Sequence, residues 1–254
     1  MLNFQRSILN KKFMSTIKQA MIFAAGLGTR FKPWTDNHPK ALAVINGKSL
    51  LQRNIEFLQQ YGIEKVVVNV HHFASQITEA LDKNKGWGSQ VTISDETDVV
   101  LETGGGLKKA ASLFADSPIV IINVDILTDF DLGAMMQFHE TTAPLATIAI
   151  TNRVTSRYFL FDEENTLCGW QNTRTGEQKI SRTVNPLIPK AFSGVHIIEP
   201  SLLKLITQEG KFSMVDVYLD LARQHTIKGF DHSYSKFIDV GKPESVPIAE
   251  ELFP

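Results

Sequence analysis

The chain has 254 residues, of which 43% are hydrophobic and 21% are charged, and its formal net charge is −1. This composition predicts a globular protein with one large domain or two small ones and a sizeable apolar core. A charge so close to zero argues against a nucleic-acid coat or a membrane-surface protein, so any basic site must be local. The single cysteine, Cys168, cannot form an internal disulfide, which favours a small buried residue in a reducing, cytoplasmic environment.

The first residues are basic but contain neither a sustained hydrophobic stretch nor a small-residue cleavage site, so they do not resemble a signal peptide. No apolar run reaches the length of a transmembrane helix. We expect residues 1–16 to be an N-terminal extension, either flexible or a helix on the surface. Residues 17–254 are expected to form a single domain, because no glycine- or serine-rich linker divides them.

Apolar runs typical of buried strands alternate with helical segments from residue 20 to about 151. The runs are AMIFAA (20–25), KVVVNV (65–70), VTIS (91–94), PIVIINVD (118–125) and LATIAIT (145–151). This alternation predicts an α/β fold with a Rossmann-like, doubly wound and mostly parallel sheet, with helices on both faces. Ligands of such sheets bind at the carboxyl ends of the strands, where Gly26 and Asp125 fall.

Four helices are predicted between these strands. The first follows Ser49, which forms a capping box with Gln52, and stops at Gly62. The others are expected near residues 74–81, 104–114 and 135–141, the last of them started by Asp129 or Asp131.

The rhythm of strands and helices changes after residue 151. A hairpin is predicted from RYFLFD and TLCGW, and a strand from AFSGVHII (191–198). Helices are expected over 199–206 and 213–225, short strands over 226–232 and 236–241, and a final helix from about Pro243. This half therefore has the pattern of an α+β lid attached to the sheet.

The stretch FAAGLGTRFKPWTDNHPKAL (23–42) leaves the first strand and is too polar to be core. A dinucleotide fingerprint would need glycine where Phe31 stands and a helix directly after it. A P-loop ending in Gly47-Lys48-Ser49 would need glycine where Leu42 stands. Both interpretations fail, so an NAD-dependent dehydrogenase is disfavoured.

A third interpretation fits the same stretch. Gly26 and Gly28 allow backbone N–H groups to approach a polyphosphate closely. Arg30 offers a planar fork of donors for phosphate oxygens, and Lys40 adds a point charge from another side. The segment is therefore predicted to bind an anionic ligand such as a polyphosphate.

The spacing G-x-G-T-R-x-x-P-x-T-x-x-x-P-K resembles the signature of the sugar-1-phosphate nucleotidyltransferases. Its positions are Gly26, Gly28, Thr29, Arg30, Pro33, Thr35, Pro39 and Lys40. The resemblance extends from about residue 18 to 250. It implies a glycosyltransferase-A-like fold with a sugar-binding lid, and a cytoplasmic enzyme that is a monomer or small homo-oligomer. The implied partners are a nucleoside triphosphate and a sugar 1-phosphate, with no nucleic acid and no membrane.

The same resemblance implies roles for individual residues. Catalysis would fall to Arg30, Lys40 and Asp125, and a Mg²⁺ ion would be held by Asp125 and Asp239. Sugar contacts would come from Gly105, Ser193 and Gly194. The nucleotide would be bound by Ala25, Gly26, Gly28, Thr29, Arg30, Glu102, Gly104 and Gly105.

Three of these residues have alternative structural interpretations. Glu102 in LETGGG (101–106) either accepts a hydrogen bond from a base N–H or acts as a favourable anion at the start of a helix. Asp125 just past a buried strand is costly unless it is paired or bound to metal. Asp239 in DVGKP either binds that metal or makes a turn before Gly241.

Within the family, the chain length, LETGGG and N-x-D-x-x-T-D are most similar to the N-acetylmuramate-1-phosphate uridylyltransferases of cell-wall recycling. We therefore expect UTP and N-acetylmuramate 1-phosphate as substrates, with GTP-dependent mannose-1-phosphate or heptose-1-phosphate guanylyltransferases as alternatives. The acidic-lysine-proline sugar motif usual after the hairpin is absent, since Glu177 and Lys179 do not form it. A non-catalytic nucleotide-sugar-binding regulator is disfavoured, because the arginine, lysine and both aspartates are present.

Overall fold

The structure, a computed structural model, describes residues 15–254. Its centre is a set of parallel strands, and β1 (Gln19–Phe23) lies between β4 (Lys65–Val70) and β6 (Ile119–Asn123). Next to β4 lies β5 (Gln90–Asp95), also parallel. Alternate residues of β1 enter different cores: Ala20 and Ile22 contact one, and Met21 and Phe23 contact the other. A strand buried on both faces must be apolar throughout, which explains the uninterrupted run in the sequence.

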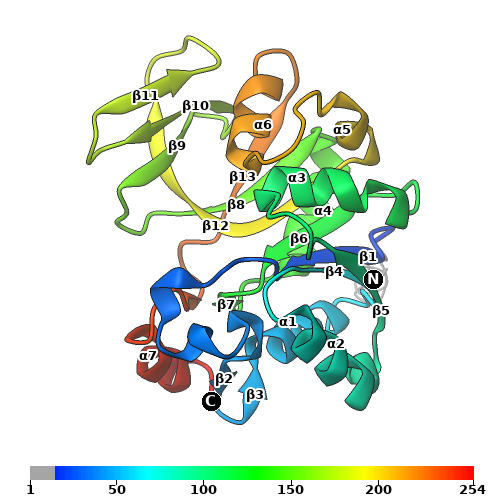
Figure 1. Ribbon diagram of the computed structural model, residues 1–254. Helices are drawn as coiled ribbons and strands as arrows, with labels where there is room; N and C mark the ends of the chain where they lie inside the picture. Colours follow the sequence, from blue (N-terminus) through cyan, green and yellow to red (C-terminus); the bar gives the residue numbers. More distant parts are fainter. Residues whose placement is uncertain (1–14) are drawn as a thin grey trace, which may run out of the picture.

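The sheet continues through the second half of the chain, so the predicted lid shares the same sheet (Figure 1). The long strand β12 (Ile188–Ile198) runs antiparallel to β6 and also pairs with β8 (Ala146–Thr151), whose parallel neighbour is β13 (Ile227–Asp231). A three-stranded antiparallel ribbon projects from the start of β12. It consists of β9 (Arg157–Phe161), β10 (Leu167–Asn172) and β11 (Glu177–Ile180). The mixed, mostly parallel sheet and the hairpin are as predicted, and β11 was not expected within a polar run.

Helices cover both faces of the sheet. One core receives α1 (Leu50–Gln59), α2 (Ala74–Lys83), α4 (Leu132–Thr142) and α7 (Ser245–Leu252). The other receives α3 (Glu102–Ala110), α5 (Pro200–Leu205) and α6 (Met214–Leu221). Within residues 15–254, none of these helices combines the length and the apolar character that crossing a bilayer requires.

Side-chain caps fix two helix starts where the sequence predicts them. Ser49 Oγ accepts from the backbone N–H of Gln52 at 3.1 Å, and Asp131 Oδ1 accepts from that of Ala134 at 3.0 Å. Each cap satisfies an N–H group that the first helical turn leaves without a partner.

Several short elements were not predicted. The strand expected over 118–125 ends at Asn123, and a separate strand β7 (Ile126–Thr128) pairs antiparallel with β14 (Phe237–Asp239). Strands β2 (Val44–Ile45) and β3 (Lys48–Ser49) pair before α1. Short 3₁₀ turns lie at Thr29–Phe31, Trp34–Asp36, Lys40–Leu42, Lys85–Gly88 and Ala111–Leu113. These elements are too short to leave a periodic pattern in the sequence.

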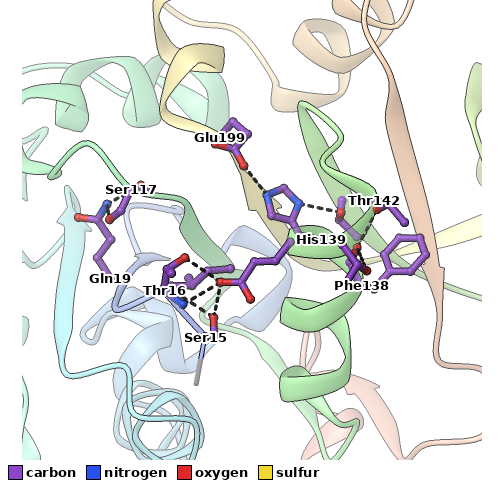
Figure 2. A network of polar contacts seen from close by, with 12 residues as sticks. Ser15, Thr16, Gln19, Ser117, Phe138, His139, Thr142 and Glu199 are labelled. Atoms are coloured by element: carbon purple, nitrogen blue, oxygen red, sulfur yellow. Dashed lines mark hydrogen bonds and ion pairs between the residues drawn. The ribbon is translucent and has the colours of Figure 1, made fainter. Parts of the chain in front are cut away.

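Residues 1–14 of the predicted extension lie outside the described residues. The two residues that follow are anchored on α4 (Figure 2). Glu140 Oε1 accepts from Ser15 Oγ at 3.0 Å and from the backbone N and the hydroxyl of Thr16, both at 2.7 Å. Residues 15 and 16, predicted as part of the extension, therefore belong to the ordered body of the protein.

A buried histidine joins α4 to the sheet next to this anchor (Figure 2). His139 is fully buried; its Nδ1 lies 2.8 Å from Thr147 Oγ1 and its Nε2 lies 3.2 Å from Glu199 Oε1. Burial lowers the pKa of His139 to about 4, against the opposing charge of Glu140. Burial also lowers the pKa of His196 to about 3 and that of His232 to about 4.

The three buried histidines predict that the folded protein becomes less stable in acid. Their folded-state pKa values lie below 6.5, so the unfolded chain binds more protons, and stability is lost as the pH falls from 6.5 toward 4. Each contributes about 2 kcal/mol of loss between pH 6.5 and pH 5. Urea unfolding at pH 7.5, 6.5 and 5 should therefore show a falling free energy of unfolding. The slope should be smaller in His139→Gln, and an equal slope in both proteins would contradict this assignment.

Candidate active site

A cavity of about 520 Å³ opens at the carboxyl ends of the parallel strands. It extends from the turn after β1 to the start of α3 and to the residues after β6. Eight of the residues predicted for the site line it: Ala25, Gly26, Gly28, Thr29, Arg30, Lys40, Glu102 and Asp125. The topology therefore brings together segments that lie about a hundred positions apart.

The loop after β1 is shaped around Gly28. Its φ is +60°, and a Cβ there would lie 2.7 Å from Thr35 Cγ2 and 3.2 Å from Lys40 Cβ. The Thr35 hydroxyl donates to the Gly28 carbonyl at 2.9 Å. A side chain at residue 28 would thus displace the two residues that close the loop, which explains the fixed spacing of Gly28, Thr35 and Lys40 in the sequence.

Two acids and one lysine meet at one end of the cavity. Pairing of β7 with β14 places Asp239 opposite Ile126, and the backbone N–H of Val240 donates to the Asp125 carbonyl at 2.8 Å. Lys40 Nζ lies 2.5 Å from Asp125 Oδ2, and the Lys40 side chain is only 10% exposed. The ion pair therefore holds the Asp125 carboxylate in a largely water-excluded position.

The carboxyl group of Asp239 is not balanced in the same way. Burial and the neighbouring charge of Asp125 raise the pKa of Asp239, while Lys40, Arg30 and Arg153 oppose that rise. Within residues 15–254, its buried Oδ1 has no hydrogen-bond partner. The Arg30 guanidinium approaches the same corner, since a Cβ at Gly241 would lie 3.3 Å from an Arg30 Nη atom and 2.8 Å from Asp239 Oδ1.

This donor set fits a hard divalent cation. Mg²⁺ is commonly held by one or two carboxylates, with waters and substrate phosphates completing its shell. Asp125 and Asp239 supply two carboxylates, one with an unpartnered buried oxygen. Among the residues that the structure describes, no group of three or more His, Cys, Asp or Glu side chains could hold a metal alone. The remaining ligands would therefore have to come from substrate and water.

A buried polar network that the sequence analysis missed lies beneath the glycine loop. Asn69 Oδ1 accepts from the backbone N–H of Ala24 at 2.8 Å, and Asn69 Nδ2 donates to Glu96 Oε1 at 2.7 Å. Glu96 is fully buried, and its burial raises its pKa. The network fixes the first residue of the loop to β4 and β5. In the sequence, the one sign of this network was Asn69, a polar residue at the end of an apolar strand.

Gly104 and Gly105 of α3 have a different role from the one predicted. The backbone N–H groups of Gly104 and Gly105 donate to the Phe212 carbonyl at 2.9 and 3.3 Å, so they do not face the cavity. A Cβ at Gly104 would lie 2.4 Å from the Phe212 ring, and one at Gly105 would lie 2.3 Å from the Gly210 carbonyl oxygen. These glycines permit close packing of the 210–213 loop on α3. The cavity is lined here by other residues, namely Glu102, Thr103, Lys211 and Ser213.

The predicted sugar residues Ser193 and Gly194 lie at an irregularity of β12, where its register with β8 shifts. Ser193 is buried and its Oγ lies 2.6 Å from His232 Nε2. Gly194 has a φ of +74°, and a Cβ there would lie 2.9 Å from Nδ2 of Asn123, which lines the cavity. Neither residue lines the cavity itself, so they are placed to shape its wall.

Glu102 lies at the cavity in a strained backbone conformation. Its φ is +58°, a region that costs a non-glycine residue about 1–3 kcal/mol. Its carboxylate lies 3.5 Å from Lys211 Nζ, and its side chain is 47% exposed. A strained acid at a cavity wall indicates that its carboxylate has a use that a glycine could not provide.

Comparison with known proteins identifies the family of proteins to which this site belongs. Residues 19–159 match the nucleotidyl transferase family. The chain belongs to this family. It is 31% identical to the N-acetylmuramate alpha-1-phosphate uridylyltransferase of Caulobacter vibrioides over 92% of this chain and 96% of that protein. The same-named protein of Neisseria meningitidis is 29% identical, over 88% and 93%.

A solved structure has the same fold. HddC from Yersinia pseudotuberculosis, complexed with GMP-PN, aligns with a TM-score of 0.74 at 24% identity over 94% of this chain and 100% of that chain. The predicted sugar-1-phosphate nucleotidyltransferase class and its fold are therefore confirmed. Nucleotidyltransferases of this family generally use a divalent metal, in agreement with the paired carboxylates.

The strain at Glu102 leads to a prediction for the nucleotidyltransferase. Glu102→Gly should stabilise the fold by about 1 kcal/mol, because glycine adopts positive φ without penalty. The same variant should raise KM for the nucleotide, since the cavity loses a carboxylate. Thermal unfolding and steady-state kinetics measure the two effects.

The matched control is Ala143→Gly. Ala143 also has a positive φ, 45°, but it is exposed at the end of α4 and does not line the cavity. It should gain similar stability with unchanged kinetics. If Glu102→Gly also left KM unchanged, Glu102 would not contact substrate.

Proposed function

We propose that the enzyme transfers the uridylyl group of UTP to N-acetylmuramate 1-phosphate, giving UDP-N-acetylmuramate and pyrophosphate. A phosphate oxygen of the sugar attacks the α-phosphorus, the new P–O bond forms, and the bond from the α-phosphorus to the bridging oxygen of pyrophosphate breaks. The single observation that carries the proposal is the convergence of Arg30, Lys40 and Asp125 on one cavity, with the carboxyl group of Asp239 close to that of Asp125. The choice of substrates is supported by the names of the two relatives.

The residues of the loop after β1 bind and orient the triphosphate. The backbone N–H groups around Gly26 and Gly28 and the Arg30 guanidinium hold the phosphate oxygens and stabilise the leaving pyrophosphate. No Cβ contact restricts Gly26, which leaves room for a phosphate there. On the opposite wall Glu102 and Thr103 contact the base and ribose, in place of the Gly104 and Gly105 amides.

Lys40 has two partners during turnover. In the free enzyme it neutralises Asp125, and with substrates bound its Nζ also faces the α-phosphate and the incoming sugar phosphate. Asp125 and Asp239 would hold Mg²⁺, and the bound ion would neutralise phosphate charge and polarise the α-phosphorus. No protein base is needed, because the attacking phosphate is already ionised at neutral pH.

The cellular role follows from the proposed chemistry. An enzyme that activates free N-acetylmuramate 1-phosphate would act in cell-wall recycling, and we place it in the cytoplasm, where UTP is available. Residues 17–254, together with the anchored residues 15 and 16, are proposed to form a single catalytic domain, as a monomer or small homo-oligomer.

The test of the proposed function is pyrophosphate release with Mg²⁺ from UTP, GTP, CTP, ATP or dTTP against a panel of sugar 1-phosphates. The panel contains the N-acetylmuramate, N-acetylglucosamine, mannose, heptose and glucose forms. We expect release with UTP and the muramate form. Release only with GTP and mannose or heptose would make the enzyme a guanylyltransferase, and nucleotide binding without release would favour a regulator.

The catalytic assignments predict specific losses. Lys40→Met and Asp125→Asn should each lower kcat by about 10²–10³-fold, because each removes charge stabilisation that develops at the reacting phosphate. Circular dichroism should show an intact fold. Near-normal turnover in either variant would remove that residue from the mechanism.

Replacing Asp239 should have opposite effects on thermal stability without and with metal. Its pKa is raised in the folded state, so its charge costs stability at neutral pH, and that cost disappears as the pH falls toward 3.8. Without metal at pH 7, Asp239→Asn should therefore melt at a higher temperature, by roughly 2–4 °C for each kcal/mol relieved. The increase in melting temperature that Mg²⁺ and UTP give the wild type should be lost in this variant. An undiminished Mg²⁺ effect would exclude Asp239 as a ligand.

A further inference from the structure

Arg153 lies in the connection between β8 and β9, at the base of the predicted lid. Its Nη2 donates to the Phe192 carbonyl of β12 at 3.0 Å. Its Cζ lies 5.3 Å from the centre of the Phe237 ring, which begins β14. The guanidinium is therefore held between the strand of the cavity wall and the strand that carries Asp239.

Among the residues that the structure describes, none forms an ion pair with Arg153. Within residues 15–254, no carboxylate lies within 4.0 Å of its guanidinium, and its only side-chain hydrogen bond is the one to Phe192. A guanidinium has five N–H donors, so most of them remain available on this exposed side chain.

Two other cations of the same half are already engaged. Lys190 Nζ lies 2.6 Å from Asp231 Oδ2 and 2.7 Å from Asn152 Oδ1. Arg182 donates to the backbone carbonyls of Ala222 and His225. An arginine that is fixed in place but not neutralised is the arrangement expected for binding an anionic ligand.

Arg153 is also linked to the residues that the sequence analysis assigned to sugar binding. Phe192, its hydrogen-bond partner, precedes Ser193 and Gly194, and Gly194 contacts Asn123 of the cavity wall. Phe237, which its guanidinium covers, lies two residues before Asp239. Its positive charge helps to lower the pKa of Asp239 against the effect of burial, so the charge is felt at the acidic end of the cavity.

Arg153 lies outside the proposed phosphate site. Arg30 and Lys40 line the cavity where the phosphates react, whereas Arg153 is not among the lining residues in the part of the chain that is described. A second anionic group on the substrate, beyond its phosphate, would fit this outer position. N-acetylmuramate differs from N-acetylglucosamine by a lactyl ether, whose carboxylate is ionised at neutral pH.

We propose that Arg153 recognises a carboxylate on the sugar 1-phosphate and thereby selects an acidic sugar over its neutral counterpart. This inference rests on the proposed function and identifies the residue that sets its sugar specificity. The planar guanidinium pairs with a carboxylate through two parallel hydrogen bonds, which a lysine cannot reproduce. The phosphate common to all sugar 1-phosphates is the competing ligand, and the experiment separates the two.

The experiment measures kcat/KM with UTP and Mg²⁺ for N-acetylmuramate 1-phosphate and N-acetylglucosamine 1-phosphate. It compares the wild type with Arg153→Met and Arg153→Lys. The wild type should prefer the muramate form. Arg153→Met should reduce the ratio of the two kcat/KM values by about 10- to 100-fold, as expected for a charged hydrogen bond, mainly through KM for the muramate form. Arg153→Lys should keep part of the preference.

The control variant is Arg174→Met, an exposed arginine in the turn between β10 and β11, which should leave the ratio unchanged. The increase in melting temperature caused by UTP should be equal in all variants, which checks the fold and the nucleotide site.

Two results would overturn the inference alone while the proposed function stands. One is an equal loss with both sugars in Arg153→Met, which would assign Arg153 to the shared phosphate. The other is an unchanged kcat/KM for both sugars. A wild type that uses UTP only with neutral sugars would contradict the proposed sugar and, with it, this inference. Absence of uridylyl transfer to any sugar would contradict the proposed function first.

Discussion

Two carboxylates that repel each other, Asp125 and Asp239, are held at one end of the cavity by the pairing of β7 with β14. Their charges are tolerated because Lys40 is bonded to one of them and Arg30 and Arg153 lie near the other. An acidic pair balanced in this way is stable but can still bind a further cation. Entry of a cation and phosphates can then exchange one set of charge partners for another without a large movement of the backbone.

The framework that carries this corner is rigid for simple reasons. β1 is apolar on both faces and lies between two parallel strands, so the loop that follows it leaves the sheet at a fixed point. Asn69 and Glu96 hold the first residue of that loop from below, and Thr35 and Lys40 close it around Gly28. The loop therefore needs no ligand to take its shape, which lowers the entropic cost of ordering it around a triphosphate.

Much of this could be predicted from the sequence because the signals are local. Uninterrupted apolar runs indicated the parallel strands, and the glycines, prolines and cations of residues 26–40 indicated a phosphate-binding loop. The short strand β7 escaped prediction, since three residues carry no period, although its pairing with β14, which was expected within 236–241, places Asp239 beside Asp125. The glycines of α3 were misplaced for a related reason: a sequence does not distinguish a glycine that admits a ligand from one that admits a packed loop such as 210–213.

The two halves of the cavity are built on different principles, and this difference bears on substrate selection. The proposed nucleotide side consists of backbone N–H groups and a closed loop, which suit the phosphates that every nucleoside triphosphate shares. The residues that we propose to discriminate between substrates are side chains at the margins: strained Glu102 with Lys211 for the base, and Arg153 for the sugar. Arg153 comes from a loop between strands, and Glu102 begins a helix whose packing is fixed by glycine. Among the described residues, Glu102 shares no hydrogen-bond partner with Lys40, Asp125 or Asp239, so a change there can alter specificity without disturbing them. A change at Arg153 also removes a positive charge that acts on Asp239.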